Sequence, residues 1–124
     1  MKYYYCVVCG NLLETIDDSG VNPECCGKKM EELEENEDET ASIEKHIPVY
    51  TVDGNKVCVY VGERQHPSTN EHYIAWIELQ TNKGVYRKII KPTELPEACF
   101  TLCGDEKIIK ISAYCNIHGL WVNR

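Results

Sequence analysis

The segment YIAWIELQ (residues 73–80) is rich in β-branched and aromatic residues, a composition typical of a buried β-strand. Turn sequences such as DGN, NKG, KPTELP and CGDE separate it from similar segments. Several short strands at this spacing predict an antiparallel β-sandwich in the second part of the chain. The other strand-like segments are KVCVYV (56–61), VYRKII (85–90), ACFTL (98–102) and KIIKISAY (107–114).

The chain has 124 residues, of which 43% are apolar and 27% are charged, as in soluble globular proteins. This length allows one modest core, or a core plus a small metal-stapled module. No apolar run approaches the roughly 18 residues that a membrane helix needs. The start MKYYYCVVCG lacks the apolar segment of a secretory signal. We therefore expect a cytoplasmic protein without membrane contacts.

The net charge of −7 is concentrated in one place. EELEENEDE (31–39) carries seven acids and no base, so the rest of the chain has 20 − 7 = 13 acids against 13 bases. We expect this acidic run to be a solvated linker, because KKMEELEE has helix-forming composition but no apolar face. No basic patch with interleaved aromatic residues is present, which argues against a nucleic-acid partner.

The first 30 residues contain CVVC and, fifteen residues later, CC. A piece of this size is too short to fold around an apolar core alone, and four thiolates favour a tetrahedral zinc or iron site. Neighbouring residues in an extended chain point apart, so we expect the adjacent pair to distort such a site. A structural zinc site and a vicinal disulfide remain alternatives. The four candidate ligands are Cys6, Cys9, Cys25 and Cys26.

All four histidines lie at loops or strand edges, and Cys115 precedes the last of them by three residues. Loops at one end of a sandwich can bring such positions together. Five donors exceed the four of a structural zinc and leave one position open on an octahedral metal such as iron. The candidate ligands are His46, His66, His72, His118 and Cys115.

One thiolate with imidazoles also suggests a blue-copper site, which usually has a weak axial methionine. The only methionines are Met1 and Met30, and neither lies near Cys115 in the sequence. A glutamine or a backbone oxygen could replace methionine, so copper is weakened and not excluded.

Seven segments give the sequence a specific resemblance to the desulfoferrodoxins, the two-iron form of superoxide reductase. They cover nearly the whole chain, in order, and include both cysteine-containing clusters. The segments are CVVCGN, CCGKKM, EKHIPV, VGERQHP, HYIAWIEL, KPTELPEACF and AYCNIHGLW.

The resemblance implies an all-β protein with two domains. Residues 1–36 would form a small desulforedoxin/rubredoxin-like domain with an iron held by the four cysteines. Residues 37–124 would form a seven-stranded immunoglobulin-like β-sandwich with a second iron. Four equatorial imidazoles (His46, His66, His72 and His118) and the axial thiolate of Cys115 would hold this second iron.

The resemblance also implies the activity. It is the one-electron reduction of superoxide to hydrogen peroxide without release of dioxygen, which detoxifies superoxide under oxidative stress. Lys45 would attract the anion, and Glu44 would occupy the sixth position once iron is ferric. The expected electron donor is rubredoxin or a related protein, and the expected assembly is a homodimer. The alternatives are a rubredoxin-like electron carrier and a zinc-stapled binding protein.

Three further cysteines belong to neither cluster: Cys58, Cys99 and Cys103. Buried and inert thiols are the default expectation for all three. An oxidation-sensitive pair between Cys99 and Cys103 is the alternative.

Overall fold

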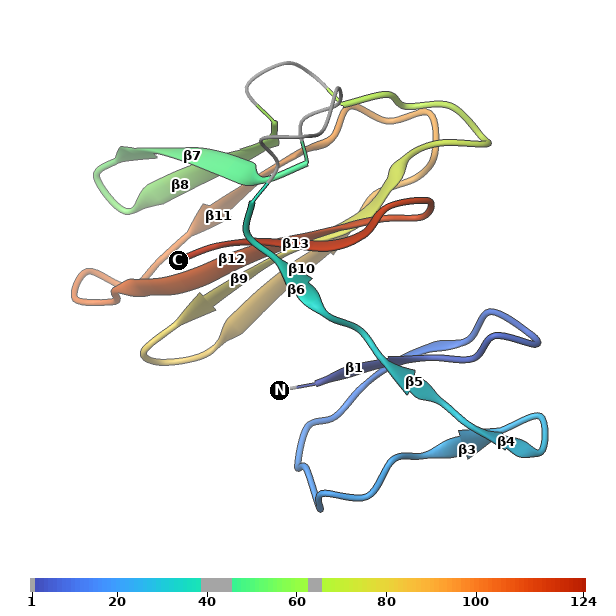
Figure 1. Cartoon of the computed structure of the whole chain (residues 1–124). Helices are drawn as coiled ribbons and strands as arrows, with labels where there is room; N and C mark the ends of the chain where they lie inside the picture. The colour runs from blue at the N-terminus through green and yellow to red at the C-terminus, as the bar shows by residue number, and fades with distance from the viewer. Residues whose placement is uncertain (1, 39–45, 63–65) are drawn as a thin grey trace. The chain divides into compact units, whose positions relative to one another are not determined.

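The computed structural model describes residues 2–38, 46–62 and 66–124. These residues form strands, turns and loops, and the all-β class predicted from the sequence is confirmed (Figure 1). None of them belongs to a helix that could cross a membrane. The chain divides into two compact units, Met1–Glu34 and Glu35–Arg124.

The N-terminal unit has little apolar core. Strand β1 lies between β2 and β5, and pairs with both in antiparallel fashion, while β3 and β4 form a separate hairpin. Its buried cluster consists of Tyr4, Cys6 and Met30, with Cys25 packed against it. So small a core needs a further source of stability, such as a metal. The strands are β1 (Tyr3–Tyr5), β2 (Leu12–Glu14), β3 (Glu24–Cys25), β4 (Lys28–Lys29) and β5 (Glu31–Glu32).

In the C-terminal unit, the described residues form a five-stranded sheet in the order β10-β9-β12-β13-β6 and a three-stranded sheet in the order β11-β8-β7 (Figure 1). All neighbouring strands are antiparallel except β13 and β6, which are parallel. The strands are β6 (Glu35–Asn36), β7 (Pro48–Asp53), β8 (Lys56–Val61), β9 (Ile74–Thr81), β10 (Val85–Ile89), β11 (Glu97–Thr101), β12 (Ile108–Cys115) and β13 (Gly119–Asn123).

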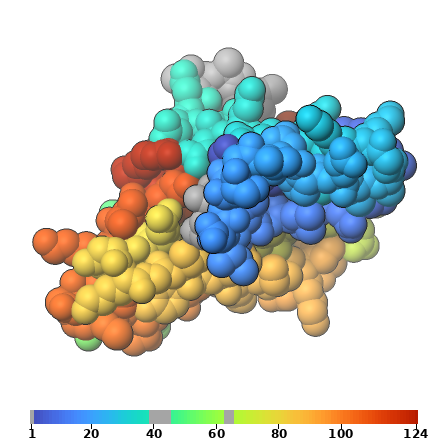
Figure 2. Space-filling model, turned by 90° about the horizontal axis from the view of Figure 1, so that it is seen from below, coloured from blue at the N-terminus to red at the C-terminus, as the bar shows by residue number. Residues whose placement is uncertain are grey.

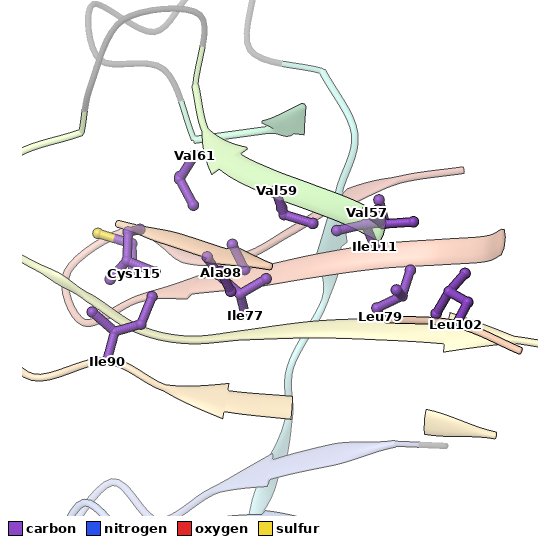
Figure 3. Close-up of a cluster of buried hydrophobic side chains, with 12 residues drawn as sticks. Val57, Val59, Val61, Ile77, Leu79, Ile90, Ala98, Leu102, Ile111 and Cys115 are labelled. Carbon is purple, nitrogen blue, oxygen red and sulfur yellow. The ribbon is translucent and has the colours of Figure 1, made fainter. Parts of the chain in front are cut away.

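The core of this unit lies between its two sheets (Figure 3). Every second residue of β8 points inward, because side chains alternate along a strand. Val57, Val59 and Val61 are therefore buried together with Ile77 of β9 and Ile111 of β12. Cys115 belongs to the same cluster and is fully buried, so one end of the core is lined by a candidate metal ligand.

The described residues of the acidic run form no helix and contain the boundary between the two units, as expected of a solvated linker, but they are not without structure. Its described residues lie at the surface (blue-green in Figure 2), but Glu31–Glu32 and Glu35–Asn36 form strands. The Glu35 carboxylate accepts a hydrogen bond from Lys110 Nζ (2.8 Å), and Glu37 pairs with Arg124 (2.5 Å). These bases are distant in sequence, so a charge count along the chain did not reveal them.

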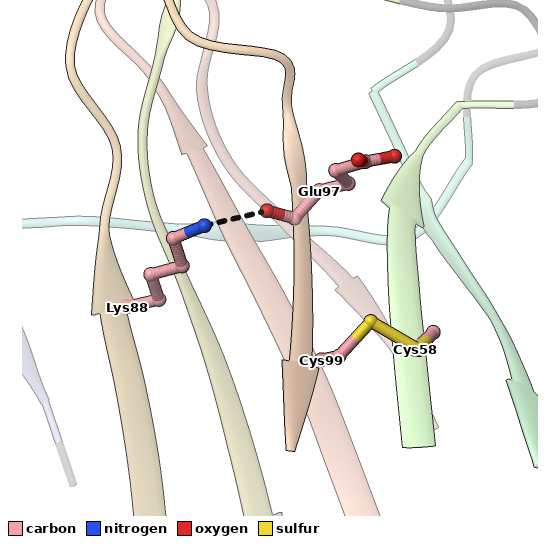
Figure 4. Close-up of a disulfide and its surroundings, with 4 residues drawn as sticks. All are labelled: Cys58, Lys88, Glu97 and Cys99. Atoms are coloured by element: carbon pink, nitrogen blue, oxygen red, sulfur yellow. Dashed lines mark hydrogen bonds between the residues drawn. A yellow bond between two sulfur atoms is a disulfide. The ribbon is translucent and has the colours of Figure 1, made fainter. Parts of the chain in front are cut away.

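The expectation for the three remaining cysteines was wrong. Cys58 of β8 lies directly opposite Cys99 of β11, and the two form a disulfide with their Cα atoms 4.0 Å apart (Figure 4). Cys103 is an exposed free thiol, so it is neither buried nor paired with Cys99. The pairing depends on the β8–β11 register, which joins residues 41 positions apart.

Replacing both Cys58 and Cys99 by alanine should lower the free energy of unfolding by about 2–4 kcal/mol, because the disulfide closes a long loop in the unfolded chain. Urea denaturation of the C-terminal unit, followed by tryptophan fluorescence, measures this loss. Cys103→Ala is the matched control and should leave the midpoint unchanged. Equal midpoints for the double variant and the control would contradict a stabilising role for the disulfide.

Candidate metal centres

The structure brings the four N-terminal cysteines together around one point. The sulfur atoms of Cys6, Cys9, Cys25 and Cys26 all lie within 4.8 Å of one another. The Cys9 and Cys25 sulfurs are 3.6 Å apart, and those of Cys25 and Cys26 are 3.9 Å apart. Four metal–sulfur bonds of about 2.3 Å in a tetrahedron would place the sulfurs about 3.8 Å apart. The cluster therefore fits one tetrahedral metal ion.

Two tight turns build this cluster. In the first, the Gly10 N–H donates to the Cys6 carbonyl (2.9 Å), which places Cys9 beside Cys6. In the second, Cys26 adopts a left-handed backbone conformation with φ of 53°, and Gly27 follows with φ of 75°. Cys26 is a non-glycine residue in this region, which costs about 1–2 kcal/mol. This left-handed residue is what lets two adjacent cysteines reach one cluster; the expected distortion of the tetrahedral site itself stays a prediction.

Hydrogen bonds and crowding shift the thiol pKa values in opposite directions. The Cys9 backbone N–H points at the Cys6 sulfur (3.5 Å) and is the main reason that the pKa of Cys6 falls to about 6. The neighbouring thiols, Cys9 first, raise the pKa of Cys26 to about 12. A bound cation stabilises all the thiolates at once, which is the usual way in which such a cluster becomes fully deprotonated.

The second cluster forms at one end of the β-sandwich. His46 precedes β7, His66 and His72 lie between β8 and β9, Cys115 ends β12, and His118 lies in the β12–β13 turn. Donor atoms of His46, His66, His72 and Cys115 lie within 4.8 Å of one another. His118 joins them, with its Nδ1 3.0 Å from His46 Nε2 and 3.8 Å from Cys115 Sγ. All five residues predicted for this cluster are therefore neighbours.

The four imidazoles form a closed ring. Each is in edge contact with the next, in the order His46, His66, His72, His118 and back to His46, with centroids 4.7–5.1 Å apart. Two adjacent nitrogens bonded to one metal at about 2.1 Å and at right angles lie about 3.0 Å apart. The distance between His46 Nε2 and His118 Nδ1 matches this value. The ring and the Cys115 sulfur thus fit a single metal ion with five protein ligands.

Hydrogen bonds and ring stacking from neighbouring residues orient these ligands. His66 Nδ1 lies 2.9 Å from the Pro67 carbonyl, which can only accept a hydrogen bond. Nδ1 therefore carries the proton and Nε2 keeps its lone pair for a metal. Trp121 stacks on His46 (centroids 4.7 Å apart, planes 15° apart), and its Nε1 donates to the His118 carbonyl (3.1 Å).

A β-bulge places the His72 side of the site. Cys115 pairs with Ile74 and Tyr114 pairs with Trp76, so Ala75 is an extra residue on β9. The extra residue shifts the alternation by one position, and Ile74 lies in the core beside Cys115. A donor atom of His72, two residues before Ile74, lies within 4.8 Å of the Cys115 sulfur at this end of the core.

Some functional residues were expected from the sequence and others were not. Lys45 and Glu44 lie outside the described residues. Trp121 and Asn116 were not singled out, although both lie in the quoted segment AYCNIHGLW. The hydrogen bonds of Asn116 to the segment 71–73 and the stacking of Trp121 on His46 are features of the folded chain, and only the nearness of both residues to Cys115 could have pointed to them.

An all-β chain with a four-cysteine cluster in one unit and a four-histidine, one-cysteine cluster in a β-sandwich is a metalloprotein with two distinct centres. Comparisons with known proteins agree. The desulfoferrodoxin family model matches residues 38–124. The chain is 43% identical to a desulfoferrodoxin homolog of Archaeoglobus fulgidus over 98% of this chain and 94% of that protein. It is 38% identical to the desulfoferrodoxin of Nitratidesulfovibrio vulgaris over 97% of this chain and 93% of that protein.

Solved structures show the same relationship. The superoxide reductase from Treponema pallidum superposes with a TM-score of 0.81 at 31% identity, covering 99% of this chain and 96% of that one. The 1Fe superoxide reductase from Giardia intestinalis gives a TM-score of 0.56 at 37% identity, covering 64% of this chain and 95% of that one. The chain belongs to the desulfoferrodoxin family, and the resemblance seen in the sequence is confirmed.

Gly119→Ala should destabilise the β12–β13 turn that carries His118. Gly119 has φ of +86°, and an alanine there would cost about 1–2 kcal/mol. Its Cβ would meet only Asn36 Nδ2 at 3.8 Å, so backbone strain and not a clash is the cause. Urea denaturation measures the change. Gly104→Ala is the control, because its φ lies outside the left-handed region and its Cβ would meet open space. Equal losses in both variants would contradict this origin.

Proposed function

We propose that this chain is a superoxide reductase, which reduces superoxide by one electron to hydrogen peroxide. The observation that carries the proposal is the closed ring of four imidazoles with the buried Cys115 sulfur. Five protein donors leave one position of an octahedral metal for a small ligand. Relatives named superoxide reductase, from Thermococcus kodakarensis and Pyrococcus abyssi among others, support this reading.

The donor chemistry supports one iron in each centre. Four thiolates suit zinc or iron, and four imidazoles with one thiolate suit a divalent transition metal that accepts more than four ligands. Iron at the first centre would make it an electron-transfer site. Zinc there would make the N-terminal unit a structural module and leave the reductase chemistry in place.

The reaction combines superoxide, one electron and two protons into hydrogen peroxide. A ferrous ion held in the second cluster would supply the electron and an open position. The residues of the chain set the conditions around it. The Cys115 sulfur is fully buried, so its negative charge is little screened and its electron density is directed to the site. The His66–Pro67 hydrogen bond keeps one imidazole in the tautomer that leaves Nε2 unprotonated.

Lys45 and Glu44 complete the proposal on the basis of the sequence resemblance. The Lys45 ammonium would attract the superoxide anion and orient water for protonation. Glu44 would occupy the open position after turnover and so control product release.

We also propose that the functional domains are 1–36 and 37–124, that the protein is a cytoplasmic homodimer, and that rubredoxin or a related protein supplies its electrons.

Metal content and colour test the proposal. The purified chain should contain close to two irons, and its visible spectrum should bleach in two steps with a mild reductant. Cys115→Ser should remove the thiolate-to-iron absorption of the second centre and leave that of the first. Pre-reduced protein should consume superoxide without releasing dioxygen. Two zincs per chain, or a colourless protein after anaerobic reconstitution with iron, would contradict the proposal, and dioxygen release would indicate a dismutase.

Lys45→Ala should slow superoxide capture about tenfold and weaken its dependence on salt, because electrostatic steering raises such rates by 10–10³-fold. Pulse radiolysis at several ionic strengths measures both effects. Lys56→Ala is the matched control, since Lys56 lies at the turn of the β7–β8 hairpin, away from the end next to His46, and should not affect capture. Equal capture rates for wild type and Lys45→Ala would remove Lys45 from the mechanism.

A further inference from the structure

Asn116 is an exposed residue beside the second cluster and is not one of its five donors. It follows Cys115 directly and precedes His118 by two residues in the β12–β13 turn. Its side chain and backbone reach the segment that carries His72, which is more than 40 residues earlier in the chain. One residue therefore connects three of the five donors.

The contacts are specific on both sides of His72. The Asn116 carbonyl Oδ1 accepts from the Tyr73 backbone N–H (2.9 Å), and Asn116 Nδ2 donates to the Glu71 carbonyl (2.9 Å). The Asn116 backbone N–H donates to the Tyr73 carbonyl (3.2 Å). The two residues that flank His72 are thus both held by Asn116. The side chain uses a donor and an acceptor at once, which only an amide of this length provides here.

Two further hydrogen bonds at the His72 backbone are local. The Thr69 hydroxyl accepts from the His72 N–H (3.1 Å), and the Thr69 N–H donates to the His72 carbonyl (2.9 Å). These bonds fold the segment 69–72 on itself, but they do not fix its distance from Cys115. The Asn116 side chain supplies that connection beyond the end of strand β9.

We propose that Asn116 is a positioning residue, which sets the distance of His72 from Cys115 and His118 and thereby the metal affinity of the second cluster. The proposal rests on the metal site of the proposed function. Hydrogen-bonded groups that orient metal ligands typically contribute 10–100-fold in affinity. Asn116→Ala keeps the backbone bond to Tyr73 and removes both side-chain bonds, so the affinity should fall within that range.

The chain offers a matched control at the opposite end of the sandwich. Asn82 Oδ1 accepts from the Lys107 N–H (2.8 Å), and the Asn82 N–H donates to the Lys107 carbonyl (3.0 Å). Asn116 makes the same two kinds of hydrogen bond with the Tyr73 backbone. Asn82 and Lys107 also join two loops, but neither residue belongs to a metal cluster. Asn82→Ala removes one side-chain bond of the same kind and should leave the metal affinity unchanged.

Cobalt(II), added alone to the metal-free full-length chain in competition with a chelator, provides the measurement. Binding at the second cluster is the component that disappears in Cys115→Ala. We expect its affinity to fall 10–100-fold in Asn116→Ala and to stay within twofold of wild type in Asn82→Ala.

Amide hydrogen exchange of Tyr73, measured without metal, tests the same contact independently of cobalt. Exchange should accelerate in Asn116→Ala and not in Asn82→Ala. Unchanged exchange in Asn116→Ala, or equal affinity losses in the two alanine variants, would overturn the positioning role. Absence of the Cys115-dependent component in wild type would instead count against the proposed metal site, while the exchange result would still decide whether Asn116 holds the His72 segment.

Discussion

The burial of one sulfur atom among four imidazoles is the constraint on which the C-terminal unit depends. Cys115 is 0% exposed, and His46 and His66 are 1% and 2% exposed. A thiolate buried in this way is costly unless a cation compensates its charge, and the imidazoles lose water contacts as well. The sandwich therefore concentrates an electrostatic cost at one end of its core, and a metal ion bound there relieves this cost for the three buried donors, while His72 is half-buried and His118 is exposed.

The geometry of this end follows from ordinary β-sheet features. The bulge at Ala75 lets Ile74 lie in the core beside Cys115, and the left-handed Gly119 returns the chain after the turn that holds His118. Trp121 lies two residues later on β13 and covers His46 with its ring. The bulge and the left-handed glycine are small irregularities in regular strand pairs. Together with Trp121 they help to bring side chains from separate loops to one point.

The sequence predicted the strand-rich fold and both donor clusters, because strand-like segments and the positions of cysteines and histidines can be recognised within short stretches of sequence. It did not predict the Cys58–Cys99 disulfide, since nothing near either residue specifies the β8–β11 register. The ion pairs of the acidic run were not predicted for a similar reason, because Lys110 and Arg124 approach it only in the folded chain. The link from Asn116 to Tyr73 likewise depends on which loops meet at the end of the sandwich.

The two clusters also differ in how the chain assembles them. The four cysteines lie within residues 6–26 and are positioned by two tight turns, so closing that cluster needs only short loops. The five donors of the second cluster span residues 46–118 and come from four separate places in the sandwich. Longer loops lose more conformational entropy when they close. In the second cluster, strand pairing in the sandwich offsets this loss before a metal binds. The first centre is therefore a site that a metal helps to fold, whereas the second is a site that the fold prepares for a metal.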